Sequence, residues 1–382
     1  MRPNTGSNSV SILDDVEAIR RIDLGNMGMM ISSFPALLKK AVELSRSLVL
    51  PRDYRSVKEI VVCGMGGSAI GGDLFRDLSQ RKIPLSVSVI RDYDLPRHVD
   101  ERSLVVAVSY SGNTEETLES FKQAYGRGSR MVAIASNGLL EKACSKLKIP
   151  FLGVPSGYTP RSALPLLFIP LLKLAEEIGF PLVGEGELDE ACRLIEKYNS
   201  KLTPETPLSQ NPAKQLAAGL HEKLPIIYSL GHLKSVALRY KDQINENAKM
   251  RAMCDQLPEA NHNEIETWEK VDFKEILHVV FIDSRFKNPY VAESIGALVS
   301  SIEREEVGLS MVKPLGETML EEVLSAIILG DWLSYYLAIL RGVDPAPVRL
   351  INNLKKKHEE RTKYLEKFEE WLAETGEDNR KT

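Results

Sequence analysis

Short apolar runs, each ending in small or polar residues and followed by a helix-forming segment, recur along this chain. In the first half we predict five strands from them, at Ile60–Cys63, Leu85–Ile90, Leu104–Val108, Met131–Ile134 and Phe151–Val154. Strands that alternate with helices at this spacing form right-handed βαβ units, which build a parallel sheet covered on both faces. The pattern therefore predicts an α/β protein.

The second half repeats this pattern more loosely. Its predicted strands are Pro225–Gly231, Ile276–Ile282 and Val307–Val312, and a long apolar helix is expected at Thr318–Leu340. A chain of this length accommodates two domains of ordinary size. We expect an N-terminal domain at 1–185, led by helices within 14–48, a C-terminal domain at 186–350, and a charged C-terminal helix at 351–382. In that helix Tyr364, Phe368, Trp371 and Leu372 recur at helical spacing, which favours packing on the protein body or on a partner.

Composition narrows the class of protein. The chain has 382 residues, of which 43% are hydrophobic and 27% charged, with a net charge of −4. This balance lacks the excess of positive charge that is typical of proteins that bind nucleic acid or an anionic membrane. The four cysteines are scattered and form no metal or disulfide pattern. We predict neither a signal peptide nor an apolar run of membrane-spanning length, and hence a cytoplasmic protein.

The clearest site signal follows the third predicted strand. The segment from Ser109 through Ser111 and Gly112 to Thr114 is rich in hydroxyls and leads directly into helix-forming residues. A helix N-terminus attracts anions because its first backbone N–H groups are unpaired. The alternative is an ordinary helix cap. Three hydroxyls and a glycine directly after a buried strand favour a phosphate monoester on a small metabolite.

A second small-residue loop, with Gly66, Gly67 and Ser68, follows the first predicted strand. In the flavodoxin-like strand order, strands one and three are neighbours at the switch point where ligands bind, so the two loops would converge on one pocket. The glycine pattern, with Asp92 after the second strand, also fits a dinucleotide fingerprint. Two such loops facing each other favour a compact sugar phosphate instead.

Four ionisable residues are further candidates. Arg161 begins an apolar helix, Glu246 lies between two asparagines near the end of a helix, His262 lies in a polar loop, and Lys355 lies in the final charged segment. Each one singly fits a structural role, as a surface ion pair or a solvated side chain. The run around His262 lacks the second histidine or cysteine that metal sites usually need, so we expect no metal.

Together these motifs resemble the bifunctional phosphoglucose/phosphomannose isomerases of archaea and some bacteria, which belong to the sugar isomerase (SIS) domain superfamily. The resemblance covers roughly residues 55–358. It rests on motifs in the same order, namely Cys63–Ser68, Ser109–Thr114, Pro160–Arg161, Asn245–Lys249, Pro258–Asn263 and the region of Lys355. The hydroxyl segment marks the superfamily only, whereas the motifs around Glu246 and His262 are more specific to the enzyme.

The resemblance implies a homodimer of two-SIS-domain chains that isomerises hexose 6-phosphates reversibly, without metal or cofactor. The residues lining the phosphate and sugar site would be Gly66, Gly67, Ser68, Ser109, Ser111 and Thr114. Arg161 would stabilise the enediolate, and Glu246 would move a proton between C1 and C2. His262, donated by the neighbouring subunit, and Lys355 would assist ring opening. Val348 lies near a position where dual-specificity relatives carry threonine, which weakens the expectation of equal activity on mannose 6-phosphate.

Three other functions remain as alternatives. A non-catalytic SIS regulatory protein would bind a sugar phosphate, but such regulators usually carry a basic recognition helix, which the acidic N-terminal segment lacks. An amidotransferring relative that makes glucosamine 6-phosphate needs an N-terminal cysteine, and the first cysteine here is Cys63. A dinucleotide-dependent oxidoreductase would rest on the glycine pattern alone.

Overall fold

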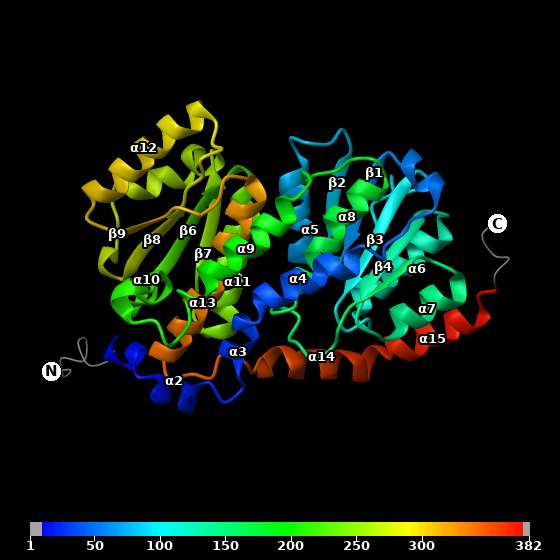
Figure 1. Ribbon diagram of the computed structural model, residues 1–382, viewed down its shortest axis with the longest axis horizontal. Coiled ribbons are helices and arrows are strands. Elements are labelled where there is room, and N and C mark those ends of the chain that lie inside the picture. The colour runs from blue at the N-terminus through cyan, green and yellow to red at the C-terminus, as the bar shows by residue number, and fades with distance from the viewer. Residues whose placement is uncertain (1–9, 377–382) are drawn as a thin grey trace. The chain divides into compact units, whose positions relative to one another are not determined.

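The computed structural model describes residues 10–376, which divide into two compact units (Figure 1). The first-sheet unit contains residues 36–188 and 348–376. The second-sheet unit contains residues 10–35 and 189–347. These units differ from the sequence-based boundaries at the N-terminus, because the first helices belong with the second half of the chain. Two contacts show this: the Tyr335 hydroxyl donates to Asp23 Oδ2 at 3.1 Å, and Lys214 Nζ lies 3.4 Å from Asp14 Oδ1.

The first-sheet unit is built on five parallel strands in the order β2-β1-β3-β4-β5. The strands are β1 (Glu59–Cys63), β2 (Ser86–Ile90), β3 (Ser103–Ser109), β4 (Arg130–Ala135) and β5 (Phe151–Gly153). Its helices are α4 (Phe34–Ser45), α5 (Gly66–Ser79), α6 (Glu115–Gly126), α7 (Leu139–Leu147), α8 (Leu164–Glu177), α14 (Arg349–Thr362) and α15 (Tyr364–Glu374). All five predicted strands are confirmed, and so is the flavodoxin-like order.

Alternating residues of this sheet face two helical layers. The side chains of Val61, Val105 and Ala133 pack against α6 and α7 in one core, which Phe368 and Leu372 of α15 extend. On the other face, α5 packs against α8 and against β1 and β2 (Figure 1). The C-terminal segment is thus two helices rather than one, and α15 buries its apolar residues on the body of this unit as predicted.

The second-sheet unit repeats the arrangement with four parallel strands in the order β7-β6-β8-β9. The strands are β6 (Leu224–Leu230), β7 (Met253–Leu257), β8 (Leu277–Ile282) and β9 (Gly308–Val312). Its helices are α2 (Val16–Ile22), α3 (Met27–Ser32), α9 (Glu187–Asn199), α10 (Pro212–Leu220), α11 (Lys234–Asn247), α12 (Pro289–Arg304) and α13 (Met319–Leu340). Strand β7 was not predicted, because its polar sequence carries no apolar run.

Helix α13 is the central helix of this unit and packs against α10 and α11. It is long and apolar enough to cross a bilayer, so the expectation that no run reaches that length is wrong. However, 94% of its apolar window is buried inside the protein. A helix that is apolar all round and covered by its own chain is typical of a protein core.

Candidate active site

Three loops meet at the carboxyl edge of the first sheet. Because β1 and β3 are neighbours, with Cys63 paired to Ala107, the segments that follow them leave the sheet side by side. We call them the glycine loop (residues 64–68) and the hydroxyl loop (residues 109–114). The third segment, the arginine loop (residues 155–163), follows β5 at the same edge. This is the edge where ligands bind in open α/β sheets.

Tyr110 connects the three loops. Its backbone N–H donates to Ser68 Oγ at 3.1 Å, and its hydroxyl donates to the Pro155 carbonyl at 3.0 Å. The same hydroxyl accepts from the Tyr158 N–H at 2.9 Å. Burial raises the pKa of Tyr110, so its phenol stays neutral and donates. No role was predicted for Tyr110, since a tyrosine inside a hydroxyl-rich motif carries no signal of a structural bridge.

Two glycines allow the close approach of these loops. A Cβ on Gly67 would lie 2.9 Å from the carbonyl oxygen of Pro160, so the start of α5 touches the backbone of the arginine loop. Gly112 has a φ of +69°, and a Cβ there would lie 1.7 Å from the Asn137 carbonyl oxygen. Only glycine fits both the left-handed conformation and the space.

The helices that follow the glycine and hydroxyl loops, α5 and α6, both start without a side-chain cap among the described residues. Met65 is the N-cap of α5 and Thr114 the N-cap of α6, and neither side chain accepts from the first turn. The hydroxyl of Thr114 instead pairs with that of Ser109 at 2.9 Å. Two sets of helix N–H groups are thus left for an anion, and each helix dipole favours negative charge there.

The remaining predicted residues of this unit lie around the same edge. Gly66 has nothing within 4 Å of its Cβ position, and Ser111 is exposed, so ligand can reach both. Arg161 is 5% exposed, which is unusual for a guanidinium. Lys355 is exposed on α14, whose N-cap is Val348. Lys355 and Val348 thus belong to the same unit as Arg161, whereas the sequence-based boundaries separate them from it.

Glu246 is placed by the last turn of α11 in the second-sheet unit and is half-buried. Its neighbour Asn247 is fully buried and donates to Ser334 Oγ of α13 at 2.9 Å. On the other side, Asn245 donates to the Met250 carbonyl at 2.8 Å. The two asparagines that flank Glu246 therefore fix the end of the helix, and with it the backbone that carries this carboxylate.

Earlier in α11, a buried ion pair ties the helix to α13. Arg239 binds Asp331 through two hydrogen bonds of 3.0 and 2.8 Å, and Gln243 donates to the same carboxylate at 2.8 Å. Arg239, Gln243 and Asn247 are spaced four residues apart and so share one helix face. This face holds the register of α11 on α13.

His262 lies at the other end of the second sheet. It ends a short 3₁₀ helix, η5 (Glu259–His262), which follows β7, and its side chain is exposed. Glu246 precedes β7 and His262 follows it, so one lies at the amino edge of the sheet and the other at the carboxyl edge. Five residues of strand put about 13 Å between these edges. Within one chain the fold does not bring the two side chains together.

The carboxyl edge of the second sheet is filled by a side chain. Here β6 and β8 are neighbours as β1 and β3 are in the first sheet. Glu322 of α13 is 1% exposed and accepts from Ser284 Oγ at 2.7 Å and from the Arg285 N–H at 3.0 Å. His232 Nε2 lies 3.0 Å from the same carboxylate. A carboxylate thus occupies the place where the first sheet leaves helix starts open.

Among the described residues, the side chains that could bind a metal ion are dispersed. Among residues 10–376, no group of three or more histidine, cysteine, aspartate or glutamate side chains is arranged to hold a metal ion. Cys63 and Cys144 are buried, and burial raises the pKa of each thiol to about 12, which makes both poor ligands and poor nucleophiles.

Comparison with known families matches both units. The family described as "Bacterial phospho-glucose isomerase C-terminal SIS domain" matches residues 209–357, and the family described as "SIS domain" matches residues 53–141. Among solved structures, a hypothetical protein from Thermus thermophilus has a TM-score of 0.69 at 17% identity. That likeness covers 93% of this chain and 97% of the other, and it establishes the fold alone.

Several relatives of similar length share a name. A bifunctional phosphoglucose/phosphomannose isomerase of Caldicellulosiruptor bescii is 35% identical over 86% of this chain and 97% of its own length. One from Thermoplasma volcanium is 36% identical over 78% of this chain and 90% of its own length. With both units, the strand order and the motifs in place, the chain belongs to the bifunctional phosphoglucose/phosphomannose isomerase family of the SIS superfamily.

Proposed function

We propose that this protein interconverts glucose 6-phosphate and fructose 6-phosphate, and also mannose 6-phosphate, by proton transfer through a cis-enediolate. The observation that carries the proposal is the pair of uncapped helix starts at the glycine and hydroxyl loops, in a chain whose relatives are named for these substrates. We further propose a cytoplasmic enzyme that needs no metal.

The phosphate group would bind at the first-sheet edge. The first-turn N–H groups of α5 and α6 would donate to its oxygens, joined by the hydroxyls of Ser68, Ser109, Ser111 and Thr114. Ser68 Oγ already accepts from Tyr110, so its own proton is available to a ligand. Binding energy from this non-reacting group would hold the sugar for each later step.

Glu246 would be the base of the isomerisation. Its carboxylate takes the proton from C2 of the open-chain aldose and returns it to C1, while the hydroxyl proton on O2 is exchanged for one on O1. No oxidant or reductant is needed, because the carbonyl and hydroxyl carbons exchange oxidation states. The guanidinium of Arg161, fixed by burial, would stabilise the negative charge on the enediolate oxygen.

Ring opening must precede this step. It moves a proton from the C1 hydroxyl to the ring oxygen, and histidine is suited to exchange protons near neutral pH. We assign this work to His262 with the assistance of Lys355. Since His262 and Glu246 lie at opposite edges of the second sheet, we propose that His262 reaches the site of the partner subunit in a homodimer.

Both C2 epimers can share this machinery. A planar enediolate loses the configuration at C2, and one carboxylate can return the proton to either face if the intermediate rotates about C2–C3. Val348 at the start of α14 is the residue we expect to set the ratio of the two aldoses. Replacing it by threonine is expected to raise the share of mannose 6-phosphate.

The first test supplies EDTA-treated protein with fructose 6-phosphate and quantifies glucose 6-phosphate and mannose 6-phosphate separately. Both products are expected. Glucose 6-phosphate alone would narrow the specificity, with Val348 the residue responsible. If the sugar phosphate binds and neither product forms, the chain is a non-catalytic sensor and the isomerase proposal is wrong.

The second test is Glu246→Gln, compared with Asp242→Asn one turn earlier on α11. General-base catalysis contributes about 10²–10⁴-fold in rate, so Glu246→Gln should lower kcat by a factor in that range. Asp242 is a solvent-facing neighbour paired with Lys241, and its substitution should leave kcat within twofold. A Glu246→Gln enzyme that retains wild-type turnover would exclude Glu246 as the base.

A further inference from the structure

Helix α14, which carries Lys355, is held in the first-sheet unit by polar contacts. None of its described residues is buried. His358 Nε2 lies 3.1 Å from Glu115 Oε2, and Thr362 Oγ1 lies 3.4 Å from the same carboxylate. Glu115 is the first residue of α6. The helix therefore docks on the helix start that borders the hydroxyl loop.

A third segment joins this contact. The hydroxyl of Tyr93, in the turn after β2, lies 3.0 Å from His358 Nε2. His358 thus has two neighbours from two different elements of the sheet's carboxyl edge. The side chain of Glu115 is only 13% exposed, so its pairing with His358 is better shielded from solvent than most surface ion pairs of the unit.

Helical spacing then places Lys355. Lys355, His358, Glu359 and Thr362 lie at i, i+3, i+4 and i+7, which is one face of a helix. The chain beyond Thr362 continues along α6, because Tyr364 donates to Glu119 at 2.7 Å, one turn after Glu115. Along this face Lys355 is one turn, about 5 Å, before His358. Lys355 therefore lies beyond the first residue of α6, on the side of the hydroxyl loop.

We propose that His358 is a positioning residue that holds Lys355 over the hydroxyl loop through its contacts with Glu115 and Tyr93. The ligand concerned is the phosphate ester of the proposed function, on which this inference rests. His358 does not touch the substrate. It fixes the helix whose lysine does.

The charges around this contact explain why a cation is needed there. Glu115, Glu116 and Glu359 face the region from α6 and α14, and Glu119 lies one turn further. Burial raises the pKa of Glu115, the Glu359 carboxylate acts in the same direction, and His358 opposes both. An incoming phosphate dianion would meet this negative field, which the ammonium group of Lys355 offsets.

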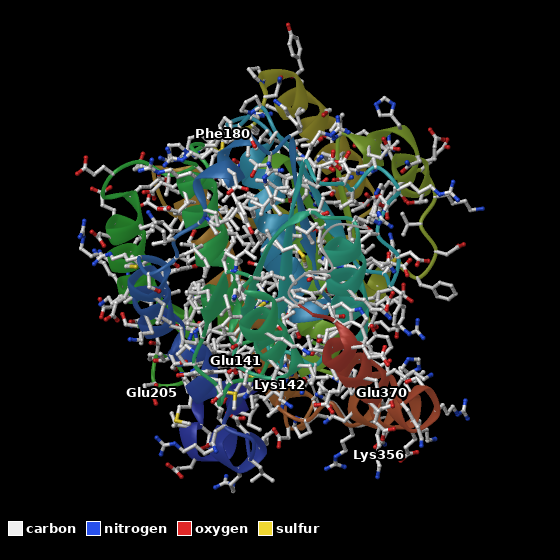
Figure 2. All side chains as sticks on the ribbon, turned by 90° about the vertical axis from the view of Figure 1, so that its right-hand side faces the viewer. Glu141, Lys142, Phe180, Glu205, Lys356 and Glu370 are labelled. Atoms are coloured by element: carbon white, nitrogen blue, oxygen red, sulfur yellow. The ribbon has the colours of Figure 1, made fainter. Side chains whose placement is uncertain are left out.

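The test reads the position of Lys355 without using activity. Amine acetylation is followed by mass spectrometry on the full chain, with and without inorganic phosphate. In the wild-type protein phosphate should slow modification of Lys355 by at least threefold. Lys356, which is labelled in Figure 2, is the internal control because it lies on the same helix. Its side chain is 79% exposed. In His358→Ala the protection of Lys355 should be lost and Lys356 should be unchanged.

A matched variant controls for loss of a surface histidine. His98, in the segment between β2 and β3, lies 3.3 Å from the carboxylate of Glu59, the first residue of β1, at the amino edge of the sheet. His98→Ala should retain phosphate protection of Lys355. If His358→Ala retains it too, or if phosphate never protects Lys355 in the wild type, the positioning role is refuted.

Kinetics then separate this inference from the proposed function. If His358 acts through Lys355, His358→Ala should lower kcat about 5- to 20-fold with KM within twofold, and add nothing in a Lys355→Met background. A multiplicative loss in the double variant would contradict the inference. If Lys355→Met itself retains full activity while phosphate protection depends on His358, the positioning role holds and the role of Lys355 in catalysis fails.

Discussion

Individual contacts at the first-sheet edge depend on residues with no part in the chemistry. Tyr110 joins three loops by hydrogen bonds from one backbone N–H and one hydroxyl, and Gly112 allows the hydroxyl loop to touch Asn137. The hydroxyls and glycines after a strand were visible in the sequence because they stand together in one short stretch of the chain. The roles of Tyr110 and His358 were not, because both act through partners far away in the chain.

A prediction at this scale concerns Glu322. Burial alone would raise its pKa, but hydrogen bonds from His232, Ser284 and the Arg285 N–H together lower the pKa below its usual value near 4.5. A carboxyl group whose pKa is depressed by folding stabilises the protein above the unfolded-state pKa. That contribution is lost as pH falls from 4.5 through the lower folded-state pKa.

The measurement is the free energy of unfolding in urea between pH 3 and pH 6. Relative to wild type, Glu322→Gln should be destabilised at pH 6, and the difference should shrink as pH falls below 4.5. The exposed Glu303 of α12 supplies the control, since Glu303→Gln should show no such pH-dependent gap. A constant gap for Glu322→Gln would mean that its charge does not matter.

Strands that are buried uniformly along their length could be predicted from the sequence. The strands of the first sheet's centre are buried along their length, as β3 is at every residue, so they read as continuous apolar runs. Strand β7 lies at an edge, is only partly buried, and contains Asp255 and Gln256. Its pairing with β6, rather than its composition, makes it a strand, and pairing partners are not visible in one sequence.

At this scale we predict the cost of breaking the contact between α11 and α13. Asp331→Ala removes the bidentate carboxylate partner of the buried Arg239, which should cost about 3–5 kcal/mol in the free energy of unfolding. The double variant Arg239→Met/Asp331→Leu should cost clearly less, since it leaves no buried charge of this pair. Urea unfolding gives both values. A single variant within about 1 kcal/mol of wild type would contradict the prediction.

In the molecule as a whole, two sheets of the same order serve different purposes. The first carries the glycine and hydroxyl loops, while the second carries Glu246 at one edge and His262 at the other. Duplication of an α/β pattern was visible in the sequence, as were the individual motifs. The membership of residues 10–35 in the second-sheet unit was not, because amphipathic helices do not reveal which core they cover.

The prediction at this scale is complementation between two inactive variants. If each site takes Glu246 from one chain and His262 from the other, co-expressed Glu246→Gln and His262→Ala chains form dimers with one intact site. Random pairing makes about half the dimers mixed, and each mixed dimer has one intact site out of two. Activity should therefore recover to about a quarter of wild type.

The control is a mixture of Glu246→Gln with Glu246→Gln/His262→Ala, which should stay inactive because no chain supplies the base. If the first mixture also stays inactive while mixed dimers are recovered by differential tags, both residues serve the same chain. In that case the two-chain site is wrong, while the isomerase proposal stands on its own test.

The carboxylate of Glu322 also has a consequence for the binding isotherm. A chain with two sheets of matching order could offer two classes of phosphate-ester site, one at each switch point. Glu322 acts as a permanent internal occupant of the second, held by Ser284, Arg285 and His232. Titration should therefore saturate at one sugar phosphate per chain, and the velocity at high substrate concentration should level off without the decline that a second occupied site can cause.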